Sequence, residues 1–194
     1  MKRSSFAFLL FAATMLVAVP ASHAVVLHFS ANLDGPSESP PVPSPGTGFA
    51  TVDIDTVAHT MDVHADFSNL VGTTTAAHIH CCVDPPGLVG VATQVPSFVG
   101  FPLGVTSGNF DSILDLTLAS SFNPAFVTAQ GGVPQAEAAL IAGLIAGDAY
   151  FNIHTTFRPG GEIRGFLGVP EPGILGLLGL GIGAAFVATR RRRS

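Results

Sequence analysis

The sequence has little charge, few cysteines and no tryptophan. Only 11% of its 194 residues are charged, which is less than half of the roughly 25% found in an average soluble domain. Self-repulsion therefore does not keep this chain unfolded, and charge-driven disorder is excluded. Two cysteines also exclude a fold that depends on several disulfides. The length suits one domain or two small ones.

Positive charge is nearly absent from the middle of the chain. Six of the eight basic residues lie at the two ends, which leaves only Arg158 and Arg164 between them. Twelve of the 13 acidic residues fall within 25–168. A body this acidic repels phosphate backbones, so we expect no nucleic-acid partner.

Residues 1–24 are predicted to be a secretory signal peptide. Two basic residues precede the uncharged apolar stretch 6–19, and small residues at Ser22 and Ala24 suit cleavage by signal peptidase. The alternative is a membrane-spanning helix, for which this stretch is short, because about 20 residues are needed to cross the hydrocarbon core. The mature chain is expected to begin at Val25 in an oxidising compartment.

The end of the chain, residues 169–194, combines a short motif, a glycine-rich apolar run over 173–189 and a basic tail. The motif and the tail consist of Pro170, Glu171, Pro172, Arg190, Arg191, Arg192 and Arg193. This order resembles the PEP-CTERM sorting signal of Gram-negative bacteria. The resemblance implies an exosortase-type membrane enzyme that cuts near the motif, after transient anchoring in the inner membrane with the body outside. The alternative is a permanent C-terminal anchor.

The body, residues 25–168, alternates apolar and polar residues with a period of two, as half-buried strands do. Strands are predicted at 25–33, 49–55, 60–67, 75–81, 90–95, 107–118, 148–156 and 162–167. A proline-rich loop follows the first of these strands, and the next two are expected to form an antiparallel hairpin. Helical spacing over 131–147, with Pro134 near its start, predicts one short helix. These elements together predict a mainly β fold, a β-sandwich with one helix.

Three segments of the body carry a family resemblance. They are the stretch 48–80, which ends in His-Ile-His, the stretch 137–155, which ends in Asn-Ile-His-Thr, and Gly-Gly-Glu-Ile-Arg-Gly at 160–165. Together they resemble the CHRD domain, which is named after chordin and also occurs in exported bacterial proteins. The resemblance covers about residues 26–168. It implies an immunoglobulin-like antiparallel β-sandwich without an established enzymatic activity.

Three histidines are candidate metal ligands. His78 and His80 lie two residues apart on a predicted strand, so their side chains leave the same face. His154 can supply a third nitrogen if its strand packs alongside. Imidazole suits zinc or copper, so the sequence allows a Zn or Cu site. In the alternative, each histidine is structural and bonds to a backbone or carboxylate group.

The two cysteines, Cys81 and Cys82, are adjacent, which excludes an ordinary loop-closing bridge. Three alternatives remain open, namely a vicinal disulfide, two free thiols, or pairing with another chain. In an oxidising compartment we favour the vicinal disulfide.

Glu162 and Arg164 also lie two apart on a predicted strand, and cations are scarce in the body. We expect both to serve structural ion pairing, with Arg164 bridging carboxylates across the sheet. A ligand-binding arginine is the alternative.

These observations predict an exported, non-enzymatic protein of the cell surface or of the extracellular matrix, such as a biofilm component. Its expected partners are signal peptidase, the exosortase-type enzyme, and an extracellular polysaccharide or surface protein. The sequence has no Gly-x-Ser-x-Gly elbow, P-loop or dinucleotide-binding glycine pattern, so neither catalysis nor an organic cofactor is expected.

Two other functions stay open at this stage. The first is an exported metal-binding protein, of redox type, that holds Zn or Cu through the three histidines. A His-x-His strand in a β-sandwich also occurs in copper–zinc superoxide dismutase, but this is a local analogy. The second is a spacer whose main biology is its terminal signal.

Overall fold

The structure is a computed structural model that describes residues 26–170. Its elements are β1 (Val26–Asp34), β2 (Thr47–Asp55), β3 (Thr60–Ser68), β4 (Thr74–Cys81), β5 (Gly108–Asp115), the 3-10 helix η1 (Ala119–Ser121), α1 (Pro124–Gln130), α2 (Val133–Ala146), β6 (Ala149–Thr155) and β7 (Ile163–Phe166). The mainly β prediction is confirmed, and the strands fall close to their predicted positions.

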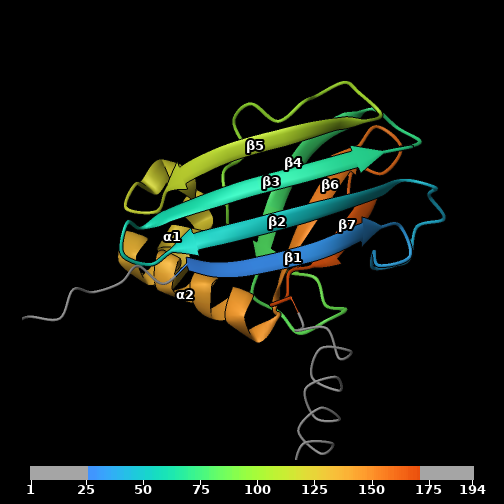
Figure 1. Ribbon diagram of the computed structural model, residues 1–194. Helices are drawn as coiled ribbons and strands as arrows, with labels where there is room; N and C mark the ends of the chain where they lie inside the picture. The colour runs from blue at the N-terminus through green and yellow to red at the C-terminus, as the bar shows by residue number, and fades with distance from the viewer. Residues whose placement is uncertain (1–25, 171–194) are drawn as a thin grey trace, which may run out of the picture.

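All seven strands belong to one antiparallel sheet with the order β4-β6-β7-β1-β2-β3-β5. The sheet curls like a half-barrel, so that β4, β6 and β7 pass behind β1, β2 and β3 in Figure 1. The two predicted layers are therefore the two halves of one continuous sheet. They are joined where Asp34 of β1 pairs with Arg164 of β7.

The core fills the inside of this curl. Alternate residues of β2 and β3 point inward, as the sequence pattern requires, and Val52, Ile54 and Val63 are fully buried. Residues of β4 and β6 enter from the other half of the sheet, among them Ile79 and Phe151. Burial of these apolar side chains is the main force that holds the two halves together.

The described part of the chain has two α-helices, whereas the sequence pattern of the body predicts one. The predicted helix corresponds to α2, which has Pro134 in its first turn and ends at Gly147 with a φ of 78°. The additional helix α1 spans only seven residues, too few to show a helical period. Its start is marked by Asn123, whose side chain accepts a hydrogen bond from the Ala125 N–H over 3.0 Å.

The predicted strand at 90–95 is wrong. This segment forms only isolated bridges, in which Val91 pairs with His80 and Thr93 with Phe122. It therefore lies beside the edge strand β4 without extending the sheet.

The predicted signal peptide (1–24) and nearly all of the predicted C-terminal signal lie outside the described residues. Within residues 26–170, no helix is both long enough and apolar enough to cross a membrane.

Candidate metal centre

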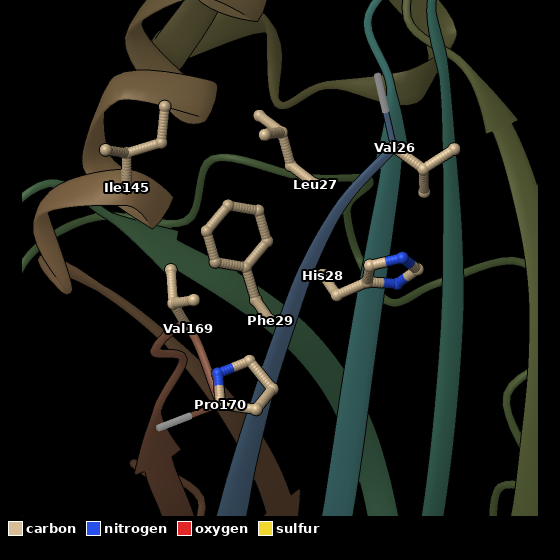
Figure 2. A pocket seen from close by; sticks show the side chains of 7 residues that line it. All are labelled: Val26, Leu27, His28, Phe29, Ile145, Val169 and Pro170. Atoms are coloured by element: carbon tan, nitrogen blue, oxygen red, sulfur yellow. The ribbon is translucent and has the colours of Figure 1, made fainter. Parts of the chain in front are cut away.

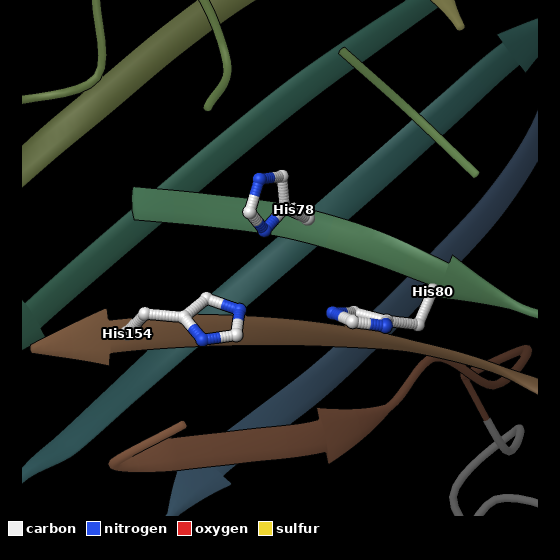
Figure 3. A group of neighbouring side chains, drawn as sticks. All are labelled: His78, His80 and His154. Carbon is white, nitrogen blue, oxygen red and sulfur yellow. The ribbon is translucent and has the colours of Figure 1, made fainter. Parts of the chain in front are cut away.

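His78, His80 and His154 gather on one face of the sheet. His78 and His80 lie on β4, and the adjacent antiparallel strand β6 places Asn152 opposite His78 and His154 diagonally beside it. One ring nitrogen of each histidine lies within 4.8 Å of the others. Figure 3 shows the three rings around a common space.

This face points away from the apolar core. The alternate residues Ala77, Ile79 and Cys81 of β4 belong to the core, so the histidines leave the strand on its other side. Two loops nevertheless cover them, and His78 and His80 are only 6% and 8% exposed. The cluster is therefore a buried polar site outside the hydrophobic core.

Each histidine uses one ring nitrogen to bond a backbone carbonyl. His78 Nε2 lies 2.7 Å from the Pro96 oxygen, His80 Nδ1 lies 2.8 Å from the Val89 oxygen, and His154 Nδ1 lies 2.8 Å from the Pro159 oxygen. A carbonyl oxygen only accepts, so each of these nitrogens must carry the proton. The other nitrogen of each neutral ring is left with a free lone pair, as in histidines that bind metal.

Those other nitrogens have no protein partner among residues 26–170. His78 Nδ1, His80 Nε2 and His154 Nε2 are all buried and make no hydrogen bond. A buried acceptor that is left unpaired costs about 1–3 kcal/mol. Three such atoms in one place are unusual, because buried polar groups in native proteins are nearly always paired.

Burial also keeps the three rings neutral. It lowers the pKa of His78 to about 4, although the bond to the Pro96 carbonyl acts in the opposite direction. Burial likewise lowers the pKa of His80 to about 4, and it lowers the pKa of His154. Neutral imidazole is the form that coordinates a metal, so the site presents its ligands in the required state at neutral pH.

The spacing of the rings is close to that of a bound site. The ring centroids of His78 and His154 lie 5.1 Å apart, and each lies 5.9 Å from that of His80. Metal–nitrogen bonds of about 2.0–2.1 Å hold two ligand nitrogens about 3.3–3.6 Å apart. The ligand nitrogens here lie within 4.8 Å of one another, so small rotations of the rings would bring them to these distances around an ion.

Cys81 and Cys82 are joined by a disulfide in the structure. Their sulfur atoms face helix α2, where Cys82 Sγ lies 3.4 Å from the Ala139 carbonyl oxygen. Cys81 belongs to the core, on the side of β4 opposite to His80. The disulfide is therefore no part of the histidine cluster.

The predicted ion pairing of Glu162 is wrong. Glu162 lies just before β7, and its carboxylate accepts hydrogen bonds from the hydroxyls of Ser44 and Thr155 and from the N–H groups of Val71 and Gly72. Burial raises its pKa, but these four bonds outweigh burial and hold the pKa below its ordinary value. Glu162 thus ties three loops together without a cation.

Arg164 is fully buried, and the carboxylate that it pairs with belongs to Glu38, in a loop and not across the sheet. Its Nε lies 3.7 Å from Glu38 Oε2, and its three nitrogens donate to the carbonyls of Ser37, Gly87 and Pro86 over 2.6, 3.1 and 2.9 Å. It therefore fastens the proline-rich loop and the loop after β4 onto the sheet. It bridges carbonyls where the sequence pattern predicted carboxylates.

Two residues beside the cluster were missed by the sequence reasoning. Tyr150 stacks on His80 with ring centroids 4.7 Å apart, and the Arg164 guanidinium lies 4.8 Å from the Tyr150 centroid. Glu38 is buried, and burial raises its pKa to about 7 even though Arg164 lowers it. A lone buried arginine signals a carboxylate partner, but the sequence offers no way to choose one within a loop.

An apolar pocket of about 550 Å³ lies elsewhere, between the start of β1 and the end of the described chain. Figure 2 shows its lining by Val26, Leu27, His28, Phe29, Ile145, Val169 and Pro170. None of these residues belongs to the histidine cluster. Pro170, the first residue of the predicted sorting motif, is thus the only part of that motif among the described residues.

Comparison with known families agrees with this architecture. The CHRD domain matches residues 29–167, and the PEP-CTERM protein-sorting motif matches residues 168–193. The chain therefore belongs to the CHRD domain family, since the match covers well over half of it. No curated protein and no solved structure matches the chain. Both predicted resemblances are confirmed.

The sorting motif also indicates where the protein is located. It implies an exported protein that is recognised by an exosortase-type enzyme and anchored transiently in the membrane of a Gram-negative bacterium.

Proposed function

We propose that this exported CHRD protein binds one transition-metal ion, zinc or copper, through His78, His80 and His154. One observation carries the proposal: three buried ring nitrogens face a common space without any protein partner. An ion at that space would satisfy all three at once. The chemistry of the donors agrees, because imidazole nitrogen is a preferred ligand of both metals.

The purely structural role is less well supported. In that role the histidines would be satisfied by neighbouring groups, and indeed one nitrogen of each ring is bonded to a carbonyl. Those bonds, however, fix the tautomer and turn the second nitrogen toward the other rings. Outer hydrogen bonds of this kind orient ligands in known metal sites.

The test is metal binding by the purified full chain, measured by titration with Zn²⁺ and with copper and by metal analysis. We expect one ion per chain and a raised melting temperature with metal, because a ligand of the folded state stabilises it. His154→Ala should weaken binding by more than about 100-fold, since loss of an outer-shell partner alone costs about 10–100-fold.

His28→Ala is the matched control. His28 is an exposed histidine of β1 that bonds Asp53 and is not part of the cluster. Its replacement should leave both the stoichiometry and the melting shift unchanged. Absence of near-stoichiometric binding, or equal loss in both variants, would overturn the proposal.

We further propose that the protein acts without catalysis at the cell surface or in the extracellular matrix, where it contacts a polysaccharide or another surface protein. Support comes from the sorting motif, which directs the chain out of the cell. Burial of the three free nitrogens also supports a closed site, because catalytic metal sites keep an accessible position for substrate. Immunodetection in separated cell, membrane and polysaccharide fractions tests this location, and recovery from the cytoplasm alone would exclude it.

A further inference from the structure

We infer that the three-histidine site is selective for monovalent copper, Cu(I), over divalent zinc. This inference rests on the proposed metal-binding function and specifies its ligand. Three properties of the site carry it, namely the number of ligands, their burial, and the charge around them.

The ligand count favours Cu(I). Among residues 26–170, His78, His80 and His154 are the only three metal-ligating side chains that can each offer one ligand atom within 4.8 Å of the other two. Structural zinc sites take four ligands in a tetrahedron. A d¹⁰ monovalent copper ion is stable with three nitrogen donors arranged in a plane around it.

Burial removes the usual source of a fourth zinc ligand. Where a protein gives zinc three ligands, water fills the fourth position. The three free nitrogens here are buried from solvent, and the loop after β4 and the loop between β6 and β7 bond the opposite nitrogens of the rings. A zinc ion would need room for this water inside the closed site, whereas trigonal Cu(I) needs no fourth ligand.

The charges around the site also favour Cu(I) over Zn²⁺. The three ligands are neutral, and no carboxylate belongs to the cluster. The permanent cation of Arg164 stacks on Tyr150, and Tyr150 in turn stacks on His80. A second positive charge on the ion increases its repulsion from the guanidinium. The monovalent ion avoids this repulsion.

Glu38, the nearest buried acid, does not belong to the histidine cluster. Glu38 pairs with Arg164, and its Oε1 makes no hydrogen bond. The hydrogen bonds that Arg164 donates go to neutral carbonyls. The site therefore lacks the carboxylate ligands that would stabilise a dication.

The test compares the two ions on the purified full chain with its disulfide intact. Cu(I) is supplied anaerobically with ascorbate in competition with bicinchoninate, and Zn²⁺ is titrated against a chromophoric chelator. We expect one Cu(I) per chain, bound at least about tenfold more tightly than Zn²⁺. X-ray absorption should show a shell of nitrogen donors at about 1.9–2.0 Å without sulfur, as expected for imidazole ligation.

A charge variant makes the test sharper. Asn152 is buried on β6 opposite His78, and its Oδ1 has no partner. Asn152→Asp adds a carboxylate there with little change in shape, so it should raise Zn²⁺ affinity relative to Cu(I) by about tenfold. Asn109→Asp adds the same charge at an exposed position on β5, at the far edge of the sheet, and should change neither affinity.

The outcomes separate the two claims. Zn²⁺ that binds as tightly as Cu(I), and is lost in His154→Ala, overturns the Cu(I) inference and leaves the metal-binding function standing. Sulfur in the Cu(I) shell overturns the inference as well, because it would place the copper on the cysteines. If neither ion binds near one per chain, both claims are wrong.

Discussion

The buried pair of Glu38 and Arg164 shows how a single residue can make stability depend on pH. Free carboxyls of glutamate release their proton near pH 4.5, whereas burial raises the pKa of Glu38 to about 7. Between these values the folded state holds the proton more tightly than the unfolded state does. The contribution of Glu38 to stability is therefore greatest below pH 4.5 and is lost as pH rises through about 7.

We predict that Glu38→Gln removes this dependence. At pH 5 the variant should match the wild type, because both side chains are neutral. At pH 8 it should be more stable by about 1–3 kcal/mol, since the wild type then buries a charge. Urea denaturation at both pH values measures the difference. A variant that loses stability at pH 8 would show that attraction to Arg164 outweighs burial.

At the same scale, the period of two along β4 is enough to place His78 and His80 on one face. The proposal that His154 joins them needed only an adjacent antiparallel strand. The sequence could not show which nitrogen of each ring is bonded, because Pro96, Val89 and Pro159 accept through backbone carbonyls that any residue carries. The partner of Arg164 was unpredictable for a related reason, since Glu38 reaches it from an irregular loop.

Among the elements, α2 has an unusual contact with the disulfide. A Cβ placed on Gly143 would lie 2.6 Å from Cys82 Sγ and would also meet Cys81 Sγ. Glycine inside a helix normally costs about 1 kcal/mol relative to alanine. Here it allows the helix to approach the paired sulfurs.

Gly143→Ala is therefore expected to destabilise the protein by about 1–3 kcal/mol, as overpacking in a core does. In a Cys81→Ala/Cys82→Ala background the same change should become neutral or stabilising, because the clash is gone and helix propensity remains. Urea denaturation of the four proteins in this cycle provides the measurement. Stabilisation by Gly143→Ala with the disulfide intact would contradict the contact.

The helices also show the limits of pattern reasoning at this scale. Fourteen residues with apolar positions at helical spacing made α2 predictable, whereas seven residues are too few to do so for α1. The segment at 90–95 alternates like a strand, yet its neighbours are too irregular for it to extend the sheet. In both cases tertiary contacts decide the structure.

For the whole molecule, the alternation of apolar and polar residues predicts the mainly β class. It does not predict the curl of the sheet. The pairing of β1 with β7 joins residues more than a hundred positions apart, and no local pattern encodes such a contact. Local hairpins, by contrast, were predictable because short connections bring neighbouring strands together.

The sorting motif gives a prediction for the whole chain. We expect Glu171→Ala to block processing, so that the unprocessed protein stays in the membrane fraction. Asp62→Ala replaces an exposed acid on β3 and should be processed normally. Cell fractionation with intact-mass analysis measures both variants. Normal release of the Glu171 variant would show that the motif is not needed for processing.

The pairing of β1 with β7 also affects how the protein leaves the cell. A polypeptide that crosses the membrane with its N-terminus first cannot complete this sheet until residues 163–166 have emerged. Closure of such distant contacts is slow, so we expect the chain to stay translocation-competent for almost its whole passage. The sorting motif follows β7 within a few residues. We therefore expect completion of the sheet nearly to coincide with arrival of the sorting motif.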